Sequence, residues 1–379
     1  MIPRVIRIAL AAVGLVVVGG TTQGCEAPGS GIQPGEQVTV YVSMPLRGPE
    51  AVEGRDVVRG ARLAIADAQG RVGKLGVRAA YLDDTSGGGS RARWSQAVAA
   101  ANARDAAEDS SAIAFLGDFA SGATRASLPI TNEARMLQVS PASTAVDLVQ
   151  PFLGAGDQVP EEVQATGERT FGRVIPSDAV QAEAAAGWTM RLGARRVGTV
   201  SDGSGFGQTM VRAFRQSLPR ARLTLSRPDL VYYGGGPERM PGSLVHGFTG
   251  MVMASDALLP HGSNELGLLV TSAAQDPSQL PPAGRRFVRA FTGRYGREPG
   301  RYAAYGYEGM AVVLDSIRRA GDQGDDRDAV VDAFFETQGR DSVLGTYSID
   351  DVGDTTLGRL AGYRLADGRP RFQTSLRVP

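Results

Sequence analysis

The residue types that most often carry out chemistry are scarce in this chain of 379 residues. It contains two histidines, His246 and His261, and one cysteine, Cys25. These residues cannot supply a zinc cluster, a Cys/His dyad or a disulfide bond within the chain. The sequence has no Gly-x-Ser-x-Gly elbow and no Walker loop, and neither histidine lies in a triad or metal motif. We therefore predict a protein that is not an enzyme and that needs no metal or cofactor.

Two further patterns could indicate a reactive or nucleotide-binding site. The segment Gly203-Ser-Gly-Phe-Gly follows an expected strand, but its third glycine comes one residue early for a dinucleotide loop, and we interpret it as a flexible turn. Paired carboxylates could act as acid and base or bind calcium, yet all of them lie in polar turns where we expect them to be solvated. These pairs are Asp83-Asp84, Asp325-Asp326 and Asp350-Asp351.

The composition is that of a globular protein with no excess of either charge. Hydrophobic residues make up 42% and charged residues 21%, which fits neither a disordered chain nor a protein with many membrane spans. The 40 basic and 40 acidic residues cancel, so we expect no nucleic-acid partner. The length favours two domains over one.

The first 24 residues have the order of regions found in a signal peptide. Arg4 and Arg7 precede an apolar stretch from Ile8 to Val18, and small and polar residues follow. This apolar stretch is shorter than the about twenty residues that a stable membrane-spanning helix needs. We expect the segment to be removed.

The position of Cys25, directly after this segment, resembles the lipobox of bacterial lipoproteins. That resemblance implies that the Cys25 thiol is lipidated and becomes the first residue of the mature protein. The residues before it, Thr22, Gln23 and Gly24, depart from the usual box, which has an aliphatic residue at the first of these positions. The alternative is ordinary secretion with a spare thiol. Residues 25–37 are rich in glycine and proline and suit a tether.

Short apolar runs alternate with segments of helical spacing through the first half of the mature chain. We expect strands at 38–42, 79–82, 112–116 and 136–139, and helices at 57–68, 91–107 and 121–133. Parallel strands need crossover connections, which helices usually provide, so this order predicts an α/β fold with a parallel sheet. Residues 149–168 have no periodicity and are expected to form a surface loop.

A second series of the same kind follows, and three helices come after it without strands between them. Because helices alone cannot close a sheet domain, we expect these three to complete the first lobe. The expected strands are 196–200, 230–233, 250–254 and 266–271, the helices are 179–192, 207–218, 282–295, 305–320 and 327–337, and 362–365 with 371–373 form a terminal hairpin. The helix expected within 236–249 is poorly supported because of its prolines and glycines.

Several strings, in order along the chain, resemble the branched-chain amino acid type (Leu/Ile/Val-binding-like) of periplasmic binding proteins, the solute-binding subunits of ABC importers. They are Met44-Pro-Leu-Arg-Gly-Pro with Gly60-Ala-Arg-Leu-Ala-Ile-Ala-Asp, Phe115-Leu-Gly-Asp-Phe-Ala-Ser-Gly-Ala-Thr, Val139-Ser-Pro-Ala-Ser-Thr, Arg173-Val-Ile-Pro-Ser-Asp, and Tyr302-Ala-Ala-Tyr-Gly-Tyr-Glu-Gly. Short strings such as these occur in the loops of many proteins, so no single one would identify a family. All of them together, in this order, indicate the family.

This resemblance implies a periplasmic-binding-protein type I fold, with two Rossmann-like parallel-sheet lobes joined by a hinge that the chain crosses three times. The first lobe would comprise 38–173 and 272–348, and the second 174–271 and 349–379. The ligand would lie in the cleft between them, and sheets of this kind independently favour ligands at the carboxyl ends of their strands.

The loop that contains Phe119, Ala120 and Ser121 follows an expected strand and precedes an expected helix. Ser121 and the amides after it would then offer hydrogen-bond donors and a helix dipole to a carboxylate. The alternative is that Ser121 only caps its helix. The resemblance gives Thr144 a similar contact with the carboxylate, with the same alternative, and gives Ala142 a backbone carbonyl contact with an ammonium group.

The resemblance also assigns residues to the ligand's ammonium group and to the walls of the cleft. Asp256 would pair with the ammonium group, because a carboxylate in a closed cleft needs a cation. The alternative is a solvated turn aspartate. Phe206 would cover the ligand and Tyr302 would line the cleft, although either ring could instead serve lobe packing.

Glu53 and Gly236 stand where relatives often place aromatic residues against the ligand's side chain. A wider and more polar pocket would follow, and we expect leucine to bind it poorly. A ligand with a polar or cationic distal group would fit better. The alternative is that Glu53 points to solvent from the start of a helix.

Together these features predict a monomeric, lipid-anchored solute-binding protein on the outer face of the cytoplasmic membrane. It would capture an amino acid or related small carboxylate by hinge closure and deliver it to an ABC permease. The alternative is a receptor module that signals to a membrane partner. A third possibility is a surface protein whose cleft has lost its ligand.

Overall fold

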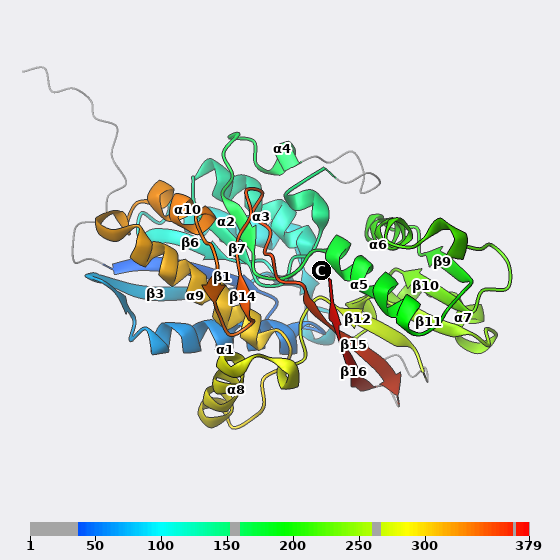
Figure 1. Cartoon of the computed structure of the whole chain (residues 1–379). Helices are drawn as coiled ribbons and strands as arrows, with labels where there is room; N and C mark the ends of the chain where they lie inside the picture. The colour runs from blue at the N-terminus through cyan, green and yellow to red at the C-terminus, as the bar shows by residue number, and fades with distance from the viewer. Residues whose placement is uncertain (1–36, 152–159, 260–266, 367–368, 379) are drawn as a thin grey trace, which may run out of the picture. The chain divides into compact units, whose positions relative to one another are not determined.

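Two six-stranded sheets organise the computed structural model, which describes residues 37–151, 160–259, 267–366 and 369–378 (Figure 1). These residues belong to one compact unit. The signal segment, Cys25 and His261 lie outside the described residues. Among the described residues, no helix combines the length and apolarity that a membrane span requires.

The first sheet has the strand order β2-β3-β1-β6-β7-β8. Its central strands pair in parallel, and only the short β2 is antiparallel. Each of the four strands predicted in this half overlaps an observed one. The bounds are β1 Gln37–Met44, β2 Arg71–Val72, β3 Leu75–Asp83, β6 Ala112–Leu116, β7 Leu137–Ser140 and β8 Phe171–Arg173.

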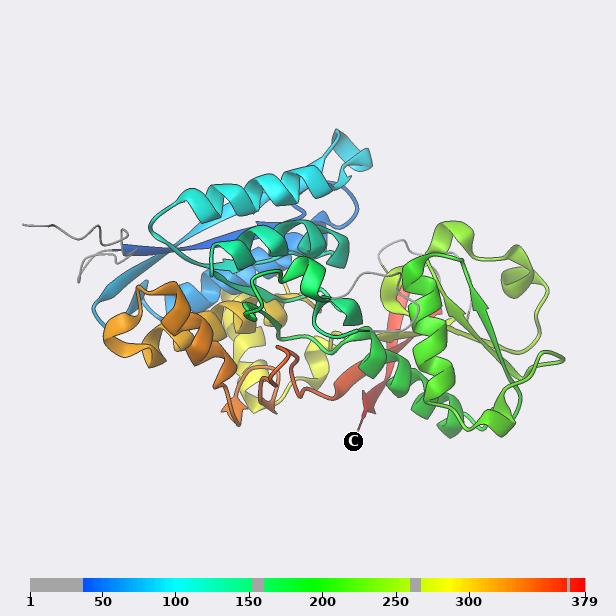
Figure 2. The same cartoon turned by 90° about the horizontal axis from the view of Figure 1, so that it is seen from above.

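Helices from both ends of the chain pack around this first sheet. α1 packs against α9, α2 packs against α3, and α10 contacts β6 and β7. Figure 1 shows α9 and α10 in orange among the blue and cyan elements of the N-terminal half, and the view from above in Figure 2 shows the same grouping. The bounds are α1 Ala51–Asp67, α2 Gln96–Glu108, α3 Ser121–Glu133, α8 Pro282–Tyr295, α9 Ala303–Arg319 and α10 Arg327–Phe335.

Two helix starts differ from the prediction by more than two residues. α1 begins at Ala51, before the expected 57, because Ala51 and Gly54 are buried and continue its apolar face toward the N-terminus. α2 begins later than expected, at Gln96. The residues before it form the short strand β5 (Arg93–Trp94), which pairs with β4 (Thr85–Ser86).

The second sheet has the order β16-β15-β12-β11-β10-β9. Four strands are parallel, and the predicted terminal hairpin, now β15 and β16, extends one side of the sheet with two antiparallel strands. α5 packs against α6, and the Phe214 ring of α6 stacks on Tyr232 with 4.0 Å between centroids. The bounds are β9 Val197–Ser201, β10 Leu230–Gly234, β11 Met251–Ala254, β12 Leu269–Ser272, β15 Arg359–Ala366, β16 Arg369–Arg377, α5 Asp178–Arg191 and α6 Gly205–Gln216.

Short elements complete the two segments that sequence periodicity described least well. The expected loop at 149–168 contains one helical turn, α4 (Pro160–Val163), and the segment at 236–249 contains α7 (Gly242–His246). The 3₁₀ turns are η1 Gly89–Arg91, η2 Val146–Leu148, η3 Arg220–Arg222, η4 Pro237–Arg239, η5 Asp256–Leu258, η6 Pro277–Gln279 and η7 Gly321–Gln323.

The chain passes between the two groups of elements three times. It leaves the first sheet after β8, returns to α8–α10 after β12, and passes back to the second sheet before β15. Arg173, at the first passage, is fully buried and forms an ion pair with Asp354, near the third. Gly353 has a φ of +95°, and a Cβ atom there would lie 2.2 Å from the Phe171 carbonyl oxygen, so no larger residue fits.

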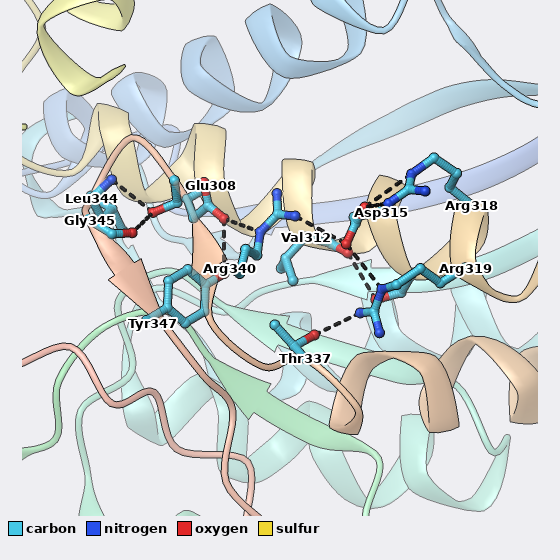
Figure 3. Close-up of polar contacts among 12 residues, drawn as sticks. Glu308, Val312, Asp315, Arg318, Arg319, Thr337, Arg340, Leu344, Gly345 and Tyr347 are labelled. Carbon is cyan, nitrogen blue, oxygen red and sulfur yellow. Dashed lines mark hydrogen bonds and ion pairs between the residues drawn. The ribbon is translucent and has the colours of Figure 1, made fainter. Parts of the chain in front are cut away.

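A buried polar network holds the third passage to α9 (Figure 3). Glu308 of α9 accepts hydrogen bonds from Arg340 Nε at 2.7 Å and from the Tyr347 hydroxyl at 2.9 Å. Arg340 also forms an ion pair with Asp315 at 3.1 Å. Arg340 and Tyr347 belong to the small strands β13 (Arg340–Asp341) and β14 (Thr346–Tyr347), so the network positions this two-stranded sheet on the helix.

Candidate functional site

A cavity of about 650 Å³ is lined by loops from both sheets. The loops follow β6 and β7 of the first sheet and β9, β10 and β11 of the second, at the carboxyl ends of parallel strands. Its size is that of small-molecule sites in proteins. All nine residues predicted to bind ligand line it, namely Glu53, Phe119, Ala120, Ser121, Ala142, Thr144, Phe206, Asp256 and Tyr302.

Ser121 is the first residue of α3, and its side chain does not cap that helix. The N-cap residue is Ala120, and α3 has no side-chain capping bond. The Ser121 hydroxyl oxygen instead accepts a hydrogen bond from the Ala145 N–H at 3.2 Å. This leaves the hydroxyl proton for a ligand acceptor at a helix start, where N–H groups lack intrahelical partners. The capping alternative for Ser121 is therefore wrong.

Thr144 and Ala142 lie in the loop after β7, beside the start of α5. The Thr144 hydroxyl group hydrogen-bonds with the carboxylate of Asp178, and the Thr144 carbonyl oxygen accepts from the Asp178 N–H at 2.8 Å. Thr144 thus has a carboxylate partner within the protein, which the sequence analysis did not anticipate. Ala142 is buried in the same wall.

Asp256 is anchored and is not a solvated turn residue. Its Oδ1 atom accepts from Gln181 Nε2 at 3.2 Å, and its Oδ2 atom accepts from the Ala273 N–H at 3.3 Å. Burial raises the pKa of Asp256 above its usual range, and the positive charge of Arg301 opposes that shift. The carboxylate therefore faces the cavity from a fixed position, and a cationic partner would stabilise its ionised form.

Four aromatic rings line the cavity. Phe119 and Tyr302 meet edge to face with 4.8 Å between centroids, so Tyr302 both packs and lines the cavity. Phe206 is the most accessible of the predicted aromatic residues, at 37% exposure. Trp94 is the fourth ring and was missed, because it lies in the short strand β5 that has no sequence signal of its own.

Glu53 faces the cavity, as predicted, but it is paired. Arg301 donates to the Glu53 carboxylate, and its guanidinium group also lies 5.4 Å from the centre of the Tyr302 ring. Burial raises the pKa of Glu53, and the charge of Arg301 opposes the shift. The alternative in which Glu53 points to solvent is wrong. Gly236 also lines the cavity.

Several charged residues of the site were not singled out from the sequence. Asp147 accepts from Arg125 of α3, and both line the cavity. Burial raises the pKa of Asp178 to about 6. Arg301 directly precedes the string that begins at Tyr302, and Asp178 ends the string that begins at Arg173. Both residues could therefore have been assigned to the site from the same strings that carry the resemblance. The remaining charged lining residues are Glu50 and Glu238.

Comparisons with known proteins agree with this architecture. The family model described as "Periplasmic binding protein" matches residues 37–236 and 244–369. A Leu/Ile/Val-binding protein homolog 1 of Brucella abortus is 26% identical over 88% of this chain and 93% of its own length. An amino acid binding protein of Pseudomonas aeruginosa is 25% identical over 87% and 90%.

Solved structures have the same fold. A leucine-binding protein of Thermotoga maritima superposes with a TM-score of 0.71 at 24% identity, over 90% of this chain and 99% of its own. A solute-binding protein of Rhodopseudomonas palustris in complex with benzoate has a TM-score of 0.69 at 15% identity, over 90% and 97%. The prediction of a type I periplasmic-binding-protein fold is confirmed. The chain belongs to the periplasmic binding protein family, and is an extracytoplasmic solute-binding protein and not an enzyme.

Proposed function

We propose that this protein captures an amino acid or related small carboxylate and delivers it to an ABC permease in the membrane. The relatives support this ligand class, because those named above are an amino acid binding protein and a Leu/Ile/Val-binding protein homolog. The benzoate complex supports the wider class of small carboxylates.

The single observation that carries the proposal is that complementary groups face one cavity. Ser121 stands at the start of α3 with a hydroxyl proton to donate, and Asp256 contributes a half-buried carboxylate after a strand of the second sheet. A zwitterion offers a carboxylate to the first group and an ammonium group to the second. Ala142 and Thr144 complete the wall between them, and Phe206 and Tyr302 cover the apolar part of the ligand.

Ligand capture would work by hinge closure. A ligand that touches groups on both lobes stabilises the closed arrangement by its higher affinity for that arrangement, and the permease then recognises the closed form. We assign 38–173 and 272–348 to the first lobe and 174–271 and 349–379 to the second. The protein acts as a monomer in this scheme.

We infer that Cys25 carries the lipid anchor, that residues 1–24 are removed as a signal peptide and that 25–37 are the tether. The anchor would hold the protein on the outer face of the cytoplasmic membrane, next to its permease. The alternative is a sensory module whose closure signals to a membrane partner. Neighbouring permease and ATPase genes favour transport, whereas a neighbouring kinase or cyclase gene favours sensing.

A thermal-shift screen against amino acids and small carboxylates, followed by calorimetry, tests the ligand class. We expect a ligand with a free carboxylate to raise the melting temperature, and its methyl ester to raise it much less. Equal binding of acid and ester would contradict a carboxylate site at Ser121. Uptake of the same ligand by cells with and without the gene then separates transport from sensing.

A further inference from the structure

We propose that Asp178 and Asp256 together form a cation-binding half of the cavity, and that the natural ligand carries more positive than negative charge, as a basic amino acid does. This inference rests on the proposed function and narrows its ligand class. It assigns a binding role to Asp178.

One face of α5 brings the two carboxylates together. Asp178 is the first residue of α5, and Gln181 lies three positions later on the same helix face. Gln181 donates to Asp256 Oδ1 at 3.2 Å and to the Thr271 carbonyl oxygen at 2.9 Å, which fixes Asp256 beside that face. Both carboxylates line the same cavity, and after burial the negative charge of Asp256 contributes to the raised pKa of Asp178.

The guanidinium groups of the cavity are already paired with other carboxylates. Six carboxylates and two guanidinium groups line it. Arg125 is paired with Asp147, and Arg301 is paired with Glu53. In the part of the chain that the structure describes, no arginine forms an ion pair with Asp178 or Asp256.

Arginines act on this pair only from a distance. The positive charge of Arg301 lowers the pKa of Asp256, and that of Arg173 lowers the pKa of Asp178, each against the larger effect of burial. Arg173 is itself paired with Asp354. Two neighbouring carboxylates in a desolvated wall are costly without cations. One α-ammonium group compensates one of them, and a second cationic group of the ligand compensates the other.

An independent feature of the same wall points to a hydrogen-bond donor. Asp147 is 4% exposed and lines the cavity, and its Oδ2 atom has no hydrogen-bond partner among the described residues. A buried acceptor without a donor is costly, and a ligand ammonium or guanidinium group would satisfy it. Asp147 acts electrostatically on Asp178, so it extends the same acidic wall.

The aromatic lining suits the same class of ligand. The faces of Trp94, Phe119, Phe206 and Tyr302 attract cations through their ring quadrupoles. Aromatic rings also accept the methylene stem of a long basic side chain. The cavity volume of about 650 Å³ has room for such a side chain.

Three closely related probes separate the two halves of the site. Arginine carries the carboxylate and both cations, citrulline lacks only the distal charge, and agmatine lacks only the carboxylate. We expect calorimetry to show arginine at least tenfold tighter than citrulline, which corresponds to 1.4 kcal/mol. Citrulline or leucine binding as tightly as arginine would overturn the cationic class and leave the proposed function standing. Agmatine binding as tightly as arginine would instead contradict the carboxylate site, and no binding of any probe or amino acid would overturn both.

The variant Asp178→Asn tests the residue assignment. It removes the charge but keeps an oxygen that can accept from Thr144, and we expect about tenfold weaker arginine binding with little change for citrulline. Asp328→Asn, in an exposed ion pair outside the cavity, is the matched control and should bind as the wild type. If Asp178→Asn also lowers the melting temperature, Asp256→Asn serves as the second variant. In both variants we compare the ratio of arginine affinity to citrulline affinity with the ratio in the wild type. A ratio equal to that of the wild type in both variants would overturn the assignment.

Discussion

Arg301 and Glu53 form an ion pair in the wall of the cavity although they lie 248 residues apart in the sequence. Glu53 belongs to the first turn of α1, and Arg301 lies two residues before α9. The packing of α1 against α9 brings the two charges together. The pair therefore links the wall of the cavity to the packing of α1 against α9.

Arg301→Met should destabilise the protein because it leaves Glu53 in a largely desolvated wall without a cation. We expect a loss of about 1–3 kcal/mol in the free energy of unfolding, measured in urea. Glu53→Gln in the same background should recover much of it. Strictly additive effects of the two substitutions would show that the ion pair contributes no coupling energy.

Ser121→Ala should weaken ligand binding roughly ten- to a hundredfold, since a hydrogen bond to a charged group is worth about 1.5–3 kcal/mol. Calorimetry with the ligand from the screen measures it. Ser121→Thr keeps the hydroxyl group and serves as the control. An affinity in Ser121→Ala equal to that of the wild type would remove Ser121 from the site.

Asp84 is fully buried, so the expectation that the pair Asp83-Asp84 is solvated is wrong for Asp84. Asp84 and the buried Asp118 should make the stability of the protein depend on pH. Burial and the neighbouring Asp118 raise the pKa of Asp84 to about 8, and burial raises the pKa of Asp118 to about 7. The unfolded value is about 3.9, so the folded state holds extra protons between pH 4 and 8. Stability is therefore fully present below the unfolded pKa and falls as pH rises, by up to about 1.4 kcal/mol per pH unit for each group.

Asp84→Asn should flatten this pH dependence. Both Asp84 oxygens are buried without hydrogen-bond partners among the described residues, so the ionised form is costly there. Urea unfolding at pH 5, 7 and 9 measures the effect. The free energy of unfolding of the variant, relative to that of the wild type, should be highest at pH 9. A parallel pH profile for the two proteins would contradict the assignment.

Glu308→Gln should destabilise the fold by about 2–4 kcal/mol, because it removes the more buried of the two carboxylates that pair with Arg340 and leaves Asp315 as the other. The exposed ion pair Arg135–Asp328 is the comparison, and Asp328→Asn should have the same unfolding midpoint as the wild type. Equal midpoints for all three proteins in thermal unfolding would show that the network of Figure 3 adds no stability.

Cys25→Ala should release the mature protein from the membrane fraction, because the thiol is the proposed point of lipid attachment. Mass spectrometry of the wild type should place a lipid on Cys25 as the first residue. Persistent membrane binding of the variant, or a mature N-terminus elsewhere, would contradict the anchor.

The sequence predicted the longer strands and helices in their order, because each has its own periodicity, but it missed strands of two or three residues such as β8, which are too short to show one. It also predicted that Ser121 lies at a helix start beside the cavity, since a strand, a loop and a helix start lie within ten residues of it. Periodicity could not predict that Arg301 faces Glu53 or that Gln181 fixes Asp256, because these contacts depend on long-range packing. The early start of α1 was missed for the same reason, since its first turn is buried by tertiary contacts.

The threefold passage of the chain between its two sheets has a consequence for the order of folding. α1 can pack against α9 only after more than two hundred further residues have been synthesised. β12 pairs with β15, which belongs to the last part of the chain. Neither half can reach its native core as a nascent fragment, and pairings this distant in sequence slow the search for the native state. The chain should therefore stay unfolded and extensible until synthesis is nearly complete, which is the condition in which a polypeptide can be threaded through a membrane pore.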